Sequence, residues 1–157
     1  MSYRESPRFI AAGIVATSTM TLFSHLASRA ARDNFNEPLL LDHLLRGTLL
    51  PRKSGIARPA GWATHYAIGC ALAAVFYHSW KYMRAKPTLS HALLYGWCGG
   101  LTAVMWWHTA FRLHPAPPRN GRTAFYLHLL AAHLVFSISV ARVCSAPMPL
   151  FTKHKSL

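Results

Sequence analysis

Four long stretches of the chain are almost free of formal charge and are separated by polar or basic connections. They cover residues 9–26, 61–80, 89–111 and 123–143, and only the last contains a charged side chain, Arg142. A helix rises about 1.5 Å per residue, so about 20 helical residues cross the roughly 30 Å of hydrocarbon in a bilayer. The pattern therefore predicts an all-α, polytopic membrane protein, with four transmembrane helices bundled in a single domain over residues 1–157.

A shorter helix is predicted in the long connection between the first two spans. Asn36 is a capping residue, and Pro38 stands where the first turn of a helix tolerates proline. Leucines follow, with a few polar side chains on one side. We expect an amphipathic interfacial helix over about 37–50, lying on the membrane surface or closing one end of the bundle. The tail, 146–157, is expected to be disordered.

The first apolar stretch has a second interpretation, a cleaved signal peptide. Basic residues precede it, and Ser28-Arg29-Ala30 resembles a cleavage site. The length of the stretch and the arginines at 29 and 32 favour a retained span. Within it, small and polar residues recur every four positions and are expected to face other helices. They are Gly13, Thr17, Thr21 and His25.

Two pairs of small residues are spaced for close contact between helices. Gly69 and Ala73 lie four positions apart in the second span, and Gly96 and Gly100 form a GxxxG pair in the third. Small side chains at this spacing allow a neighbouring backbone to approach closely. We expect these residues to lie at helix contacts within the bundle or between subunits.

The composition supports a membrane protein and indicates its partners. Hydrophobic residues make up 52% of the chain and charged residues only 13%, whereas soluble proteins carry about 25% charged residues. The net charge of +13 comes from basic residues dispersed among the connections, without a nucleic-acid-binding motif. We therefore expect anionic lipids, rather than nucleic acid, as the partner. The 3 cysteines, an odd number, argue against a disulfide framework.

Histidines are the main candidates for chemistry. The chain has 10, and an antiparallel bundle places several of them near the membrane side that holds the first and third connections. Neutral imidazole binds transition metals and haem iron, and facing helices of a bundle often build such sites. Yet HxxxH, HExxH and CxxC spacings are absent, and no span contains a carboxylate that would orient an imidazole. The candidate set is His25, His65, His108, His128 and His133.

Three functions remain open at this point. The sequence has no recognisable nucleophile with its base, acid pair or phosphate loop. We therefore expect no catalytic residues and no cofactor, in a non-enzymatic protein that associates with lipids, a membrane partner or its own copies. The alternatives are a redox protein that binds haem or a transition metal through the histidines, and a pathway for protons or a small solute.

Several segments resemble those of a known group of bacterial proteins. They are NEPLLLDHLL, GWATHYAIGCALAAVFYHSW, GWCGGLTAVMWWHTAFRLHPAPPRN and FYLHLLAAHLVF. Together with His65-Tyr66, His114-Pro115 and His128, they make residues 9–143 similar to small four-helix inner-membrane proteins of unknown function, the YagU-like group. The resemblance implies an integral protein of a bacterial inner membrane, and it transfers no catalytic residues.

Overall fold

The computed structural model describes residues 6–146 and is all-α over this range, as predicted. Four long helices contain the four apolar stretches, and two of them, α1 and α5, are long and apolar enough to cross a membrane. The predicted disordered tail lies outside the described residues from position 147 onward. The five helices are α1 (Ser6–Ala31), α2 (Glu37–Leu45), α3 (Ala57–Tyr82), α4 (Leu89–Leu113) and α5 (Arg122–Ser145).

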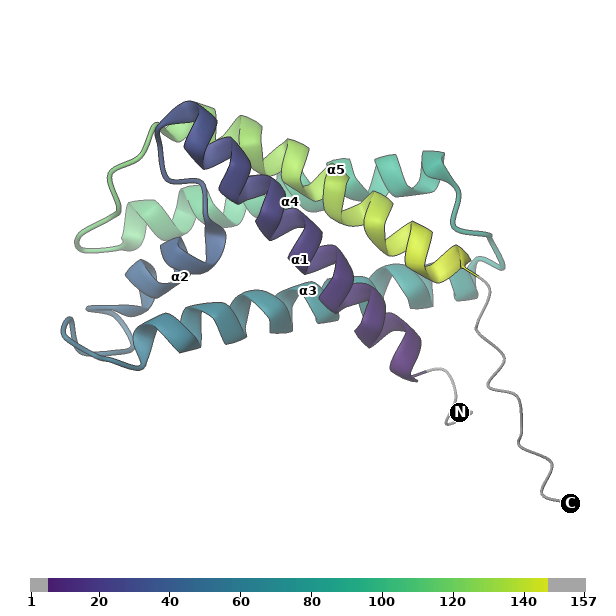
Figure 1. Cartoon of the computed structure of the whole chain (residues 1–157), viewed down its shortest axis with the longest axis horizontal. Coiled ribbons are helices and arrows are strands. Elements are labelled where there is room, and N and C mark those ends of the chain that lie inside the picture. The colour runs from purple at the N-terminus through teal and green to yellow at the C-terminus, as the bar shows by residue number, and fades with distance from the viewer. Residues whose placement is uncertain (1–5, 147–157) are drawn as a thin grey trace, which may run out of the picture.

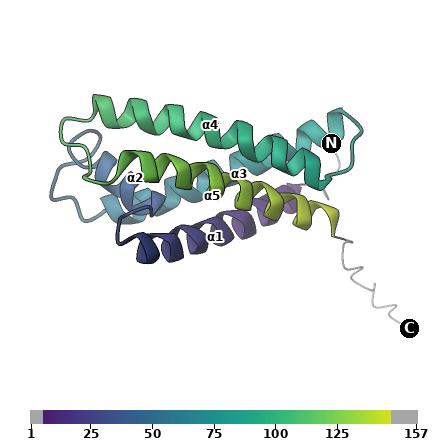
Figure 2. The same ribbon diagram turned by 90° about the horizontal axis from the view of Figure 1, so that it is seen from above.

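The long helices follow one another in space in the order α4, α5, α1 and α3. Helix α5 packs against both α4 and α1, and α1 packs in turn against α3 (Figures 1 and 2). Helices α3 and α4 are consecutive in the chain, but their described backbones do not pack closely together. Aromatic side chains join them instead, with the rings of Phe76 and Tyr95 4.8 Å apart. The bundle therefore has an open seam between α3 and α4.

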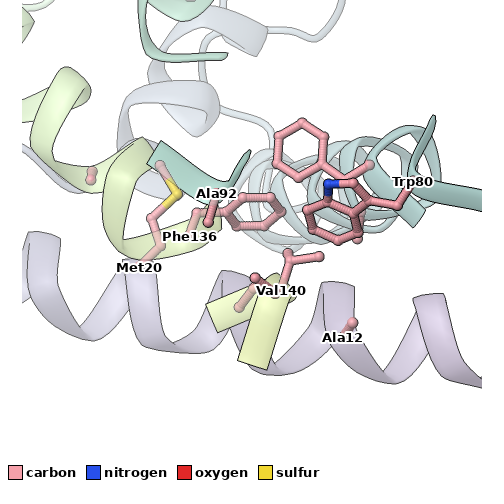
Figure 3. Packing of buried hydrophobic residues seen from close by; sticks show 11 residues of the cluster. Ala12, Met20, Trp80, Ala92, Phe136 and Val140 are labelled. Carbon is pink, nitrogen blue, oxygen red and sulfur yellow. The ribbon is translucent and has the colours of Figure 1, made fainter. Parts of the chain in front are cut away.

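Buried side chains form two clusters along the bundle. The first lies between the long helices and includes Met20, Trp80 and Phe136 around fully buried alanines (Figure 3). The second lies nearer to α2 and includes Leu40 and Phe125. Because the second cluster contains residues of α2, this short helix is part of the core.

The small residues of the long helices lie where helices meet. A Cβ atom added at Gly69 would lie 1.9 Å from Thr17 Oγ1 on α1, and one at Gly96 would lie 2.9 Å from the Leu134 backbone on α5. Gly100 is also buried against α5, and Ala73 is fully buried in the first cluster. These positions allow the backbones of α1 and α3, and of α4 and α5, to approach closely.

Helix α2 is shorter than the predicted 37–50 and ends at Leu45. Arg46 is extended, and Gly47 has φ +80°, a left-handed conformation that favours glycine and stops the helix. The backbone of α2 rests on Gly61 of α3, where an added Cβ would lie 2.6 Å from the Pro38 carbonyl oxygen. Helix α2 thus closes one end of the bundle (Figure 1), the second of the two arrangements expected from its pattern.

Candidate functional site

A cavity of about 500 Å³ occupies the seam between α3 and α4. Its walls include Leu72 and Phe76 from α3 and Trp106 from α4, while Met20 of α1 and Phe136 of α5 lie behind them. The volume falls in the range of small-molecule sites, roughly 300–1,000 Å³, and such sites are largely apolar with a few polar groups. The cavity is therefore the first candidate for a binding site.

A buried glutamate lines this cavity. Glu37 stands in the first turn of α2, is 2% exposed, and accepts a hydrogen bond of 3.0 Å from the Ser24 hydroxyl through Oε1. Its second oxygen, Oε2, is buried and has no hydrogen-bond partner among the described residues. Removing a carboxylate from water is costly unless its oxygens are paired. Glu37 is therefore held in the bundle with part of its bonding capacity unused.

His128 of α5 completes a polar chain with Ser24 and Glu37. Its Nε2 lies 2.9 Å from the Ser24 hydroxyl and 3.5 Å from Glu37 Oε1. Since the Ser24 hydroxyl donates its hydrogen to Glu37, it accepts one from His128, so Nε2 carries the proton. The imidazole is stacked between Phe23 and Phe35, with ring centroids 5.3 and 5.0 Å away.

This contact supplies, from outside the four apolar stretches, a carboxylate that those stretches do not contain. None of the four apolar stretches contains an acid, but α2 brings Glu37 back to His128 from the connection. The residues Asn36-Glu37-Pro38 indicated only the start of a helix. The burial of Glu37 follows from the docking of α2 on α3, which local sequence does not reveal.

Two further histidines line the cavity. His65 Nε2 lies 3.0 Å from the Thr21 hydroxyl, which donates its own hydrogen to the Thr17 carbonyl oxygen. His65 therefore donates through Nε2, and its Nδ1 is an acceptor. His133 Nδ1 donates to the Leu129 carbonyl oxygen at 2.8 Å, which makes its Nε2 an acceptor. In their neutral forms both imidazoles thus keep an unprotonated nitrogen.

The other two candidate histidines lie elsewhere. His25 is exposed, and His108 is exposed with its Nδ1 3.3 Å from the Tyr126 hydroxyl. The structure thus brings His65 and His133 to the cavity and His128 to Glu37, which also lines it, but it does not gather all five. Within residues 6–146, no group of three or more His, Cys, Asp or Glu side chains is placed to hold a metal ion. Haem or metal binding through these histidines stays an untested alternative.

His43 and His114 join the first and third connections at the α2 end. Their rings are 5.6 Å apart, and each imidazole donates from Nε2 to the backbone of the opposite connection. The accepting carbonyl oxygens belong to Ala116, at 2.8 Å, and Arg46, at 3.2 Å. These two histidines are structural, because their hydrogen bonds are directed to backbone groups.

The polar residues of α1 were only partly visible in the sequence. The stripe of small and polar residues at every fourth position correctly turned Thr17 and Thr21 toward α3. It also predicted the same for His25, which is exposed instead. Ser24, one position away, takes the buried place beside Glu37 and His128. The four-residue spacing selected His25 and therefore did not select Ser24, which lies one position before it.

Comparison of the chain with protein-family models, curated proteins and solved structures finds no match.

Proposed function

We propose that the chain is a non-enzymatic integral membrane protein that crosses the bilayer with α1, α3, α4 and α5. Between α3 and α4 it holds the apolar part of a lipid or of another molecule dissolved in the membrane. The observation that carries this proposal is the cavity in the α3–α4 seam, which has largely apolar walls. A bilayer is the environment in which such a molecule is abundant.

Exposed apolar side chains support four crossings. Soluble monomers seldom expose large contiguous apolar patches, and such surfaces mark contacts with membranes or other proteins. Helices α1 and α5 also have the length and composition of membrane spans. Examples from all four long helices are Ile14 and Leu22 of α1, Ile68 and Val75 of α3, Leu94 and Met105 of α4, and Leu127 of α5.

The cavity borders this apolar surface. Ile68 of α3 and Trp106 of α4 both line the cavity and are 52% and 49% exposed. A molecule dissolved in the hydrocarbon therefore has a lateral route between the two helices that avoids water. Basic residues in the connections, such as Arg52, Lys53 and Arg119, would attract anionic headgroups at the same time.

A cavity-filling variant tests this proposal. A Cβ atom added at Gly99 meets nothing closer than the His133 ring at 3.4 Å, and the residue lines the cavity, so Gly99→Trp should fill the space. Leu94→Trp is the matched control, because Leu94 is exposed on the same helix and does not line the cavity. Binding of a fluorescent probe that has a long alkyl chain and no carboxylate to detergent-purified protein is the measurement.

We expect Gly99→Trp to lose probe binding and Leu94→Trp to keep it. A wild-type protein that binds no probe and carries no lipid in native mass spectrometry would overturn the proposal.

A pathway for protons is the second candidate, favoured by the buried chain of Glu37, Ser24 and His128. Hydrogen-bonded carboxylates and imidazoles inside membranes often relay protons. Proteoliposomes containing a pH-sensitive dye would show faster dissipation of a proton gradient than empty liposomes, and Glu37→Gln would abolish the difference. Equal rates with and without the protein would exclude this function.

A further inference from the structure

Three polar side chains that line the cavity, Glu37, His65 and His133, offer hydrogen-bond acceptors to it. Glu37, as a carboxylate, accepts only, and its Oε2 has no partner among the described residues. His65 and His133 each use their one N–H in a bond within the protein, to Thr21 and to the Leu129 carbonyl. What these three side chains offer to a bound molecule is therefore lone pairs.

We propose that the cavity selects a lipophilic molecule whose polar end donates hydrogen bonds, an alcohol or an ammonium group, and that Glu37 receives this end. The inference rests on the proposed function, because it assumes that the cavity holds an apolar molecule.

The state of Glu37 gives the first reason. The side chain is nine-tenths buried or more, and Ser24 and His128 approach only its Oε1. A buried carboxylate oxygen without a donor is destabilising, and a donor supplied by a ligand relieves that cost. A head group that donates a hydrogen bond to Oε2 therefore removes this cost when it binds.

Charge gives the second reason. The chain has a formal charge of +13, yet Glu37 is the only acidic residue among the described residues that line the cavity, and no Lys or Arg lines it. An ammonium group therefore finds an opposite charge there without a competing cation. A carboxylate head group would meet a like charge in the same place, where the surroundings screen it poorly. Fatty acids should accordingly be rejected.

Thr17 adds a further polar group beside the cavity, one that favours a polar head group over an alkyl chain without choosing between donors and acceptors. Thr17 lines the cavity, and its hydroxyl, which lies against Gly69, is buried and lacks a hydrogen-bond partner in the described part of the chain. A hydroxyl accepts as well as donates. Any polar head group can therefore satisfy it, whereas an alkyl chain leaves it unpaired.

Four ligands with the same alkyl chain test the selection: decylamine, decanol, decyl methyl ether and decanoate. Each would compete with the carboxylate-free fluorescent alkyl probe on the full-length wild-type protein in detergent. We expect the amine and the alcohol to bind about tenfold or more tightly than the ether, and decanoate to bind most weakly. Amine binding tighter than alcohol would identify charge pairing, and equal binding would identify hydrogen bonding, as the source of the preference.

The variant Glu37→Gln replaces the unpaired acceptor, Oε2, with a hydrogen-bond donor. The amide oxygen replaces Oε1 toward Ser24 and His128, and the amide NH₂ then occupies the place of Oε2. We expect the preference for donor head groups over the ether to fall to within about twofold. Asp42→Asn is the control, because Asp42 is an acid of the same helix that pairs with Arg46 and does not line the cavity.

The outcomes separate this inference from the proposed function. If all four ligands bind equally to the wild type, selection by a donor head group is wrong, while the cavity still binds an apolar molecule. If the probe binds and none of the four displaces it, selection by a donor head group is likewise wrong. If the probe itself does not bind, the proposed function fails. The wild-type series decides the question even if Glu37→Gln does not fold.

Discussion

At the scale of single residues, His128 combines more stabilising contacts than any other candidate histidine. It is 7% exposed, stacks between two phenylalanines, and donates to Ser24 beside Glu37. We expect His128→Ala to lower the free energy of unfolding by about 3 kcal/mol, through a lost ring and a broken polar chain. His25→Ala, at an exposed position, should change it by less than about 0.5 kcal/mol. Unfolding in detergent measures both, and equal effects would contradict the buried site.

The placement of the histidines also leads to a prediction about cofactors. His25 and His108 are exposed, and His128 bonds Ser24, so these three are not free to converge with His65 on one ion. We expect purified protein to show no Soret band and no stoichiometric transition metal. An absorption spectrum and elemental analysis check this. A bound metal that is lost on His65→Ala would instead support the redox alternative.

Sequence reasoning located part of this site and missed its carboxylate. The positions of His65, His128 and His133 along their apolar stretches marked them as candidates, because position along a helix follows from residue number. The rotation of a helix about its axis does not follow from residue number, so exposed His25 and His108 were grouped with them. Glu37 was missed because its burial depends on contact with residues far along the chain.

At the scale of helices, two glycines of α4 should respond oppositely to the same substitution. A Cβ at Gly96 would lie 2.5 Å from the Ser137 hydroxyl and 2.9 Å from the Leu134 backbone of α5, so Gly96→Ala forces the helices apart. A Cβ at Gly99 meets no atom closer than 3.4 Å. We expect Gly96→Ala to destabilise by about 1–3 kcal/mol.

Gly99→Ala should be neutral or stabilising by up to about 1 kcal/mol, because alanine favours helix. Thermal unfolding of both variants in the same detergent is the measurement. Equal midpoints would show that α4 and α5 do not touch at Gly96.

The docking of α2 is open to a similar comparison. A Cβ at Gly61 would lie 2.6 Å from the Pro38 carbonyl oxygen and 2.7 Å from the Asp42 nitrogen, both backbone atoms that cannot move independently. We expect Gly61→Ala to displace α2 and speed tryptic cleavage at Arg52 and Lys53. Gly55→Ala, where an added Cβ meets nothing within 4 Å, should leave the cleavage rate unchanged. Equal rates for the two variants would place α2 away from α3.

The helices themselves were the predictable part of the structure. Charge-free stretches and proline-rich connections depend on local sequence, so the five helices appeared within a few residues of their expected bounds. The end of α2 was placed too late, since the left-handed Gly47 and the extended Arg46 stop it before the next proline. Short helices depend most on such single residues.

At the scale of the whole molecule, the open seam is the feature that the sequence did not predict. Consecutive antiparallel helices usually pack as neighbours. Here α3 and α4 each pack on a different helix, and bulky rings such as Phe76 and Tyr95 lie between them. The volume left along the seam becomes the cavity. Its existence depends on which side chains face each other across two helices, and apolar periodicity does not specify that.

The proposed crossings fix which connections share a side of the membrane. His43 and His114 tie the first and third connections together, so residues 49 and 116 should lie on one side, and residue 84 on the other. Leu49, Ala116 and Arg84 are exposed and suit single-cysteine substitution once Cys70, Cys98 and Cys144 have been replaced.

Labelling with an impermeant thiol reagent, on intact and on permeabilised cells, is the measurement for this arrangement. We expect positions 49 and 116 to label alike and position 84 to show the opposite pattern. Intact mass should also show that α1 is retained, because Ala12, Ala16 and Met20 belong to the buried cluster of the bundle. Opposite labelling of 49 and 116 would refute the arrangement of four crossings. Identical labelling of all three positions would mean that α3 and α4 do not cross, and the seam between them would then face water rather than lipid.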